Sequence, residues 1–259
     1  MVALRAGDTP WKRVPSRSRA PAVNPTSPDA AGGVPSTIHR LRPLSLLAAR
    51  TPDTLEAERL VRDPSLFKWY AVALLAFVIY VYANEYERRR FDIIAAGLAV
   101  WLADWFNEIV NSLVLQASDR APLWATTGPT AYQFLIGLNV EISFMFALAG
   151  IVYAKLLPAD RGARVLGMPN RFAVALGLSL VSVAVELFLH ASGTFHWEYW
   201  WWNTPFVPPI VIFGYLWFYL FAAWVFDAPT GRKRWTRVGV LAAIDVTMGL
   251  VFGVGFGWL

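Results

Sequence analysis

Residues 172–190 read FAVALGLSLVSVAVELFLH, an apolar run interrupted near its end by one glutamate, Glu186. About 20 apolar residues at 1.5 Å per residue cross roughly 30 Å of hydrocarbon, so this run predicts a transmembrane helix. The apolar residues are continuous and do not alternate with polar ones, which favours a helix over a strand of a membrane barrel. A carboxyl group inside such a helix is costly and points to a functional site.

Five more runs of this kind follow or precede it, so we predict an all-α fold, a polytopic membrane protein with a bundle of about six transmembrane helices. The composition agrees, because 56% of the residues are hydrophobic and 16% charged, against roughly 45–50% and about 25% in soluble domains. The transmembrane helical domain is expected at 66–259. Its helices are predicted at about 66–83, 91–115, 130–156, 172–190, 208–226 and 238–259.

The N-terminal residues 1–65 have a different character. They are basic and rich in Pro and Arg, without an apolar period, which is typical of a disordered tail. The first 68 residues hold eleven Lys and Arg against six Asp and Glu, which accounts for the whole net charge of +5. We expect no nucleic acid partner. An alternative is that translation starts further downstream and the tail is dispensable.

Orientation follows from the short loops, because basic loops stay in the cytoplasm. Basic residues gather at 88–90, 155–171 and 232–237, whereas the loops at 116–129 and 191–207 hold Arg120 alone. We therefore predict a multi-pass protein of the cell membrane with the basic loops cytoplasmic and both termini outside. The basic tail conflicts with this orientation, unless the first helix lies on the membrane surface.

Three glutamates lie within the predicted spans. With this topology Glu108, Glu141 and Glu186 fall about 10, 16 and 8 Å below the outer membrane face. We expect them to converge in one layer, with His190 one helical turn after Glu186. The alternative is that each carboxyl group only forms hydrogen bonds between helices. The predicted catalytic residues are Glu108, Glu141, Glu186 and His190.

A second informative stretch is 192–209, SGTFHWEYWWWNTPFVPP, with four Trp and one Tyr in six positions. Aromatic residues concentrate at membrane interfaces, so an anchoring hairpin explains the composition. A compatible hypothesis is that the segment covers the glutamate layer and offers aromatic faces to a ligand. Together with asparagines of the spans it supplies the predicted substrate-binding residues: Asn107, Asn111, Asn139, His196, Trp197, Glu198, Trp201 and Asn203.

Signals for cofactors are weak. The chain has no cysteine, and we find no phosphate-binding loop or nucleophile elbow. Glu186 and His190 share one helical face, so a divalent metal ion is an alternative, but the Glu-x-x-His spacing of di-iron bundles is absent. We predict no metal and no cofactor.

Two classes of function remain. The first is an intramembrane enzyme that acts on a lipophilic substrate, an isoprenoid or another lipid, in which a buried glutamate donates a proton and aromatic rings stabilise the resulting cation. Cyclases, hydratases and isomerases use this chemistry. The second is a non-enzymatic membrane subunit or small transporter that handles protons or cations. The expected partners are membrane lipid, a lipophilic small molecule and another helix, packed on Gly249, Gly253 and Gly257.

Overall fold

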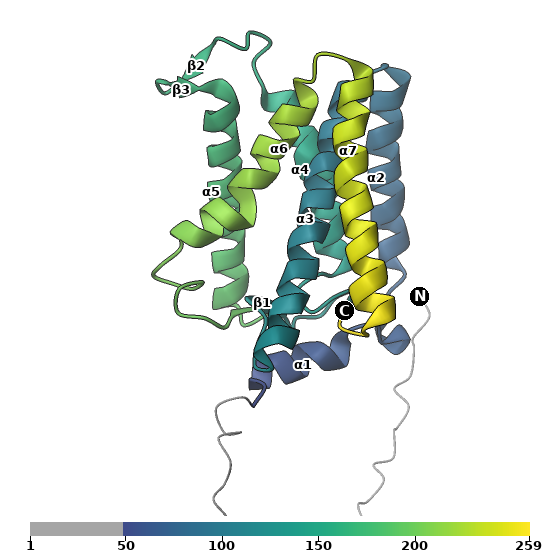
Figure 1. The fold of residues 1–259 in the computed structure, drawn as a ribbon, viewed down its shortest axis with the longest axis vertical. Coiled ribbons are helices and arrows are strands. Elements are labelled where there is room, and N and C mark those ends of the chain that lie inside the picture. Colours follow the sequence, from purple (N-terminus) through teal and green to yellow (C-terminus); the bar gives the residue numbers. More distant parts are fainter. Residues whose placement is uncertain (1–48) are drawn as a thin grey trace, which may run out of the picture. The chain divides into compact units, whose positions relative to one another are not determined.

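Helices make up most of residues 49–259, the part of the chain that this computed structural model describes (Figure 1). Two short antiparallel sheets accompany them, β1 with β4 and β2 with β3. The main helices are α1 (Pro52–Leu60), α2 (Tyr70–Glu87), α3 (Phe91–Ser118), α4 (Val140–Leu156), α5 (Asn170–Ala191), η3 (Ile210–Leu216), α6 (Trp217–Phe226), α7 (Gly231–Met248) and η4 (Gly249–Gly255). The short elements are η2 (Pro64–Leu66), β1 (Trp124–Thr126), β2 (Arg164–Val165), β3 (Met168–Pro169) and β4 (Phe195–Trp197).

Helix α3 lies at the centre of the bundle, where it packs against α4, α6 and α7 (Figure 1). Its buried face includes Ala95, Ala96, Ala99 and Ala103, small residues that let neighbouring helices come close. Gly150 of α4 meets this face. A Cβ at Gly150 would lie 2.5 Å from the backbone oxygen of Ala96, so the close approach of α3 and α4 depends on the glycine.

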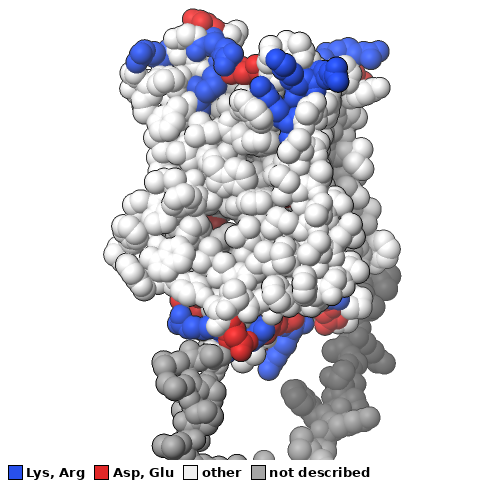
Figure 2. Space-filling view, viewed as in Figure 1, with Lys and Arg blue, Asp and Glu red and all other residues white. Residues whose placement is uncertain are grey.

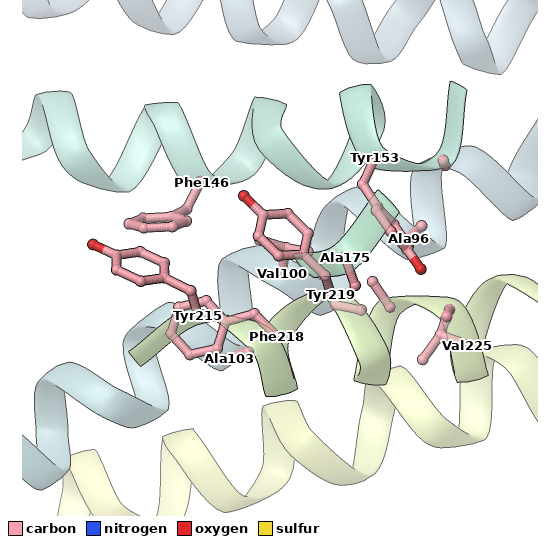
Figure 3. Packing of buried hydrophobic residues seen from close by; sticks show 14 of the residues in the cluster. Ala96, Val100, Ala103, Phe146, Tyr153, Ala175, Tyr215, Phe218, Tyr219 and Val225 are labelled. Carbon is pink, nitrogen blue, oxygen red and sulfur yellow. The ribbon is translucent and has the colours of Figure 1, made fainter. Parts of the chain in front are cut away.

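Aromatic side chains fill the space between α3, α4 and α6, as Figure 3 shows. Phe146 stacks on Tyr215 with ring centroids 5.9 Å apart, and Tyr153 packs on Tyr219 at 5.4 Å. Helix α5 takes less part in this core, because few of its residues are buried, namely Asn170, Ala175, Ser179 and Val183. It is attached mainly through η3, α6 and β4.

On the face that Figure 2 shows, nearly all charged side chains lie at the two ends of the described bundle, with an almost uncharged belt between them. The three basic connections lie at one end (Figures 1 and 2). Within residues 49–259, three helices are long and apolar enough to cross a membrane: α3, α5 and the continuous α7 and η4. The prediction of a helical bundle is therefore confirmed, while the count of six spans is not established.

The predicted start of the third helix, at residue 130, is too early. Residues 130–139 are not helical, and α4 starts only at Val140. Asn139 ends the loop, since its side chain accepts a hydrogen bond from the amide of Ile142 as the N-cap of α4. The loop folds beneath the bundle around Gln133, whose side-chain amide donates to the backbone oxygens of Leu135 and Ile136.

The predicted disordered tail is wrong for residues 49–65, while residues 1–48 lie outside the described part. Helix α1 occupies much of that range, capped by the side chain of Thr51. It has no apolar stripe and packs through the small, fully buried Ala57 against Leu115, Ala125 and Ile136. Together, α1, β1, β4 and the loops at 119–139 and 198–209 form what we call the end layer, which covers the end of the bundle where α3 stops.

Candidate functional site

A cavity of about 50 Å³ lies inside the bundle next to the end layer. Side chains of α3, α4, α5, η3 and α6 surround it, and Trp124, Phe195 and Trp202 of the end layer close it on one side. A cavity can hold a water molecule from about 10–15 Å³ upward, so this one has room for a few waters or for one end group of a larger ligand.

Three carboxyl groups line the cavity: Asp104 and Glu108 from successive turns of α3, and Glu186 from α5. Asp104 and Glu108 are 4% and 3% exposed. Among the described residues no Lys, Arg or His contributes to the lining. Burying carboxyl groups without a countercharge is costly, and this cost marks the cavity as more than a packing defect.

In each glutamate of the cavity, one carboxyl oxygen accepts a hydrogen bond and the other has no hydrogen-bond partner. The hydroxyl of Tyr215 donates to Oε1 of Glu186. The indole Nε1 of Trp124 donates to Oε1 of Glu108 over 2.8 Å. Oε2 of Glu108, Oε2 of Glu186 and Oδ2 of Asp104 are buried without a hydrogen-bond partner. The two glutamates are thus fixed in orientation and keep an oxygen for a ligand or a proton.

A glycine leaves room for this arrangement. A Cβ at Gly137, in the loop before α4, would lie 2.6 Å from Oε2 of Glu108. It would also collide with the indole ring of Trp124. The free oxygen of Glu108 therefore depends on the absence of a side chain at this position.

Aromatic rings form part of the remaining wall. Trp124 stacks on Trp202 with centroids 5.6 Å apart, and Phe146 stacks on Tyr215. Acid groups set against aromatic faces can protonate an apolar group and stabilise the positive charge that results.

Of the three predicted asparagines, Asn107 lines the cavity, and its Nδ2 donates to the backbone oxygen of Phe213 at 3.0 Å. Asn111 is fully buried and serves the end layer instead. Its Oδ1 accepts from the amide of Leu123 at 2.7 Å, and its Nδ2 donates to the backbone oxygen of Trp124 at 2.8 Å. It therefore positions the residue that holds Glu108. Asn139 is the cap of α4 described above.

Glu141 does not join the other two glutamates. Its Oε1 accepts hydrogen bonds from the hydroxyl of Tyr70 and from the amide of Ala131, and its Oε2 from the hydroxyl of Thr130. The expected convergence of three glutamates therefore applies to Glu108 and Glu186, while Glu141 ties the start of α2 and the loop to α4. The sequence-based topology missed this because it treated residues 130–139 as helix.

The two predicted histidines lie in or beside the end layer. His190 stacks on Trp197 at 4.8 Å, and its Nδ1 lies 3.0 Å from the backbone oxygen of Phe195. Nδ1 of His196 lies 3.2 Å from Oδ2 of Asp53. Within residues 49–259 there is no group of three or more His, Asp or Glu that could hold a metal ion.

The remaining predicted binding residues mostly stabilise the end layer. Glu198 accepts a hydrogen bond from Thr51 at 2.8 Å, and Asn203 donates to the backbone oxygen of Trp197 at 2.9 Å. Trp197 is buried in the sheet opposite Trp124, while Trp201 is partly exposed. The aromatic segment thus divides, with Trp202 facing the cavity and Trp200 facing outward.

Several cavity residues were not predicted as site residues. Asp104 has a visible signal, its four-residue spacing from Glu108. Trp202 belongs to the aromatic segment 192–209, which was expected to cover the glutamate layer. Trp124, Gly137 and Tyr215 carry no signal, because they reach the cavity from a strand, a loop and another helix whose placement no local pattern reveals.

Comparison with known proteins places the chain in a family. The profile of a family described as "Uncharacterized membrane protein family" matches residues 51–254. A protein of Archaeoglobus fulgidus, described as an uncharacterized protein, is 44% identical over 204 residues, 79% of this chain and 97% of its own length. A second protein of that organism, with the same description, is 38% identical over 53 residues, 20% of this chain and 95% of its own.

No solved structure matches the chain. The family match supports a location in a membrane, in agreement with the uncharged belt. The chain belongs to this membrane protein family, and the matched region contains every residue of the cavity.

Proposed function

We propose that the carboxyl cavity is the active site of an intramembrane enzyme that acts on a lipophilic substrate, an isoprenoid or another lipid, by acid and base chemistry. The observation that carries the proposal is the half-bonded state of Glu108 and Glu186. One oxygen of each is held by Trp124 or Tyr215, and the other is buried without a partner. General acids and bases need this combination of fixed orientation and a free oxygen.

The reaction that fits is a proton shift across a carbon–carbon double bond. Glu186 in its neutral form donates its proton to one carbon of the double bond, and the π electrons form the new C–H bond. The neighbouring carbon becomes a cation, which the aromatic rings stabilise. Glu108 in its ionised form then removes a proton from the next carbon, and that C–H pair forms the new double bond. Protons and electrons balance without an oxidant or a reductant.

We further propose that the protein lies in the cell membrane with its basic connections in the cytoplasm. The cavity adjoins the end layer, at the opposite end from those connections. The reaction would then take place in the outer half of the bilayer.

The test uses exchange of protons with solvent. Purified protein in liposomes is incubated in ²H₂O with a total lipid extract that includes unsaturated isoprenoids, and deuterium in each lipid is measured by mass spectrometry. We expect deuterated lipids with the wild type and with Glu141→Gln. With Glu186→Gln we expect incorporation to fall by roughly 10²–10⁴-fold. Equal incorporation by the wild type and Glu186→Gln would overturn the proposal.

A second candidate is proton handling without a substrate. It is favoured by the three carboxyl groups and by the lack of a basic group in the described lining. In this case no lipid gains deuterium, and liposomes that contain the wild type conduct protons faster than liposomes that contain Glu186→Gln.

A further inference from the structure

The cavity reaches the outer surface of the bundle within the uncharged belt. Two of its lining residues, Met145 of α4 and Val185 of α5, are 43% and 42% exposed. Figure 2 shows acidic side-chain surface inside the belt, at an opening between uncharged side chains. The belt is the part of the molecule that faces acyl chains, so this opening faces lipid.

On the other side, the end layer separates the cavity from water. Trp124 and Phe195 stand in the paired strands β1 and β4, and Trp202 stacks on Trp124. Beyond the strands, α1 packs against β1. A ligand from the aqueous phase would have to displace this packed layer, whereas a ligand from the bilayer would not.

The polar groups of the cavity also select for charge. Asp104, Glu108 and Glu186 line it together, and the described lining contains no cation. A site lined by one sign of charge attracts the opposite sign and repels its own. Even neutral carboxyl groups offer donors and acceptors to a hydroxyl or an amine, while a phosphate or carboxylate would meet no basic partner there.

We infer that the cavity is loaded sideways from the lipid phase and accepts the uncharged or positively charged end of a long-chain molecule, but not an anionic end. Its volume of about 50 Å³ admits only that end group, so the rest of the chain stays between the helices and the lipid. The inference rests on the proposed function only in regarding the cavity as the site, and its test requires no turnover.

The test exploits the absence of cysteine from the chain. Ser182 of α5 lines the cavity and is half-buried, so Ser182→Cys places one thiol inside it. Ser192→Cys, just after the same helix, places a thiol at an exposed position outside the belt. Val181→Cys places one on the exposed surface of α5, at a position that does not line the cavity.

In liposomes, uncharged N-cyclohexylmaleimide should label Ser182→Cys and Val181→Cys from the bilayer. Anionic sulfonatoethyl methanethiosulfonate should label Ser192→Cys and react with Ser182→Cys roughly 10-fold to 1,000-fold more slowly. Similar rates of the anionic reagent at Ser182→Cys and Ser192→Cys would show an entrance from water. Failure of the maleimide at Ser182→Cys, with labelling of Val181→Cys, would show a cavity closed to lipid. Either result overturns the inference.

Charge selection is tested by protection of Ser182→Cys with three probes of equal chain length. We expect oleylamine and oleyl alcohol to slow maleimide labelling, and oleate to leave it unchanged. Protection by oleate equal to that by oleylamine would overturn the selection of charge. Because labelling is independent of catalysis, these results stand apart from the deuterium experiment.

Discussion

Two kinds of glutamate occur in this bundle, and they differ in how many of their oxygens are bonded. Glu141 has both oxygens occupied, by Tyr70, Thr130 and Ala131. Glu108 and Glu186 have one oxygen occupied each and one open to the cavity. A fully bonded carboxyl group holds segments together, whereas a half-bonded one retains the capacity to bind or transfer a proton.

Their positions explain the difference. Glu141 lies in the first turn of α4, where the helix dipole favours a negative charge and the preceding loop supplies donors. Glu108 and Glu186 lie well inside α3 and α5, where the helices satisfy their own backbone groups and offer the carboxyl groups no backbone donors. A glutamate within a membrane protein therefore indicates a functional site only if one of its carboxyl oxygens lacks a hydrogen-bond donor.

The largest effect expected from this contrast is on catalysis. Glu108→Gln and Glu186→Gln should each reduce deuterium incorporation into lipid by roughly 10²–10⁴-fold. The double substitution should lose no more than either single one, because the two groups act as a unit. A double variant whose loss equals the product of the single losses would mean that they act separately.

The next largest effect is on stability. Glu141→Ala removes the acceptor for three donors and should lower the free energy of unfolding by roughly 1–3 kcal/mol. Thermal unfolding in detergent measures this change. Glu141→Gln, which keeps a carbonyl acceptor, should lose less. If Glu186→Gln were more destabilising than Glu141→Ala, the division into structural and functional glutamates would be wrong.

A smaller effect is expected from Tyr215→Phe, which removes the donor to Glu186. The lost hydrogen bond corresponds to about 0.5–1.5 kcal/mol, and we expect a fall in deuterium incorporation smaller than that of Glu186→Gln. Tyr219→Phe is the matched control. Tyr219 is buried nearby, and its hydroxyl lies 3.4 Å from the hydroxyl of Ser182 and forms no hydrogen bond to a carboxyl group among the described residues. Equal rates for the two variants would show that Tyr215 does not orient the acid.

The smallest effect concerns a carboxylate in water. The side chain and amide of Ser65 hydrogen-bond Asp63 and hold its pKa below the ordinary value. This interaction contributes to stability above the pKa of the unfolded chain and is lost as the pH falls through the lowered pKa. Ser65→Ala should raise the pKa of Asp63, as NMR titration would show, with little change in unfolding. A large change in unfolding would place Asp63 among the structural carboxyl groups.

The sequence predicted the helices well where apolar runs are long. The assignments 91–115 and 172–190 correspond to α3 and α5, whose ends moved by only a few residues. Helix α7 begins earlier than predicted, at Gly231, because the side chain of Thr230 caps a basic first turn. Gly249 and Gly253 lie in η4, but Gly257 lies beyond it with a positive φ, so the predicted three-glycine ridge does not continue along one helix.

Prediction of the site was less complete for a physical reason. Spacing along one helix identifies which side chains share a face, and Asp104 and Glu108, four residues apart in α3, both line the cavity. It carries no information on which loop residues fold back onto that face, and Trp124 and Gly137 do so through the sheet and the loop before α4. Hydropathy also cannot predict the hydrogen bonds that distinguish Glu141 from Glu186.

The bonds around Thr51 have one further consequence. This residue caps α1 and also donates to Glu198 in the loop after β4, while neighbouring Arg50 pairs with Glu58 and approaches Asp119. The start of the described chain is thereby fastened to two connections that are far away in the sequence. A protein shortened to begin at residue 49 keeps this fastening, and one shortened to begin at residue 62 loses it together with α1.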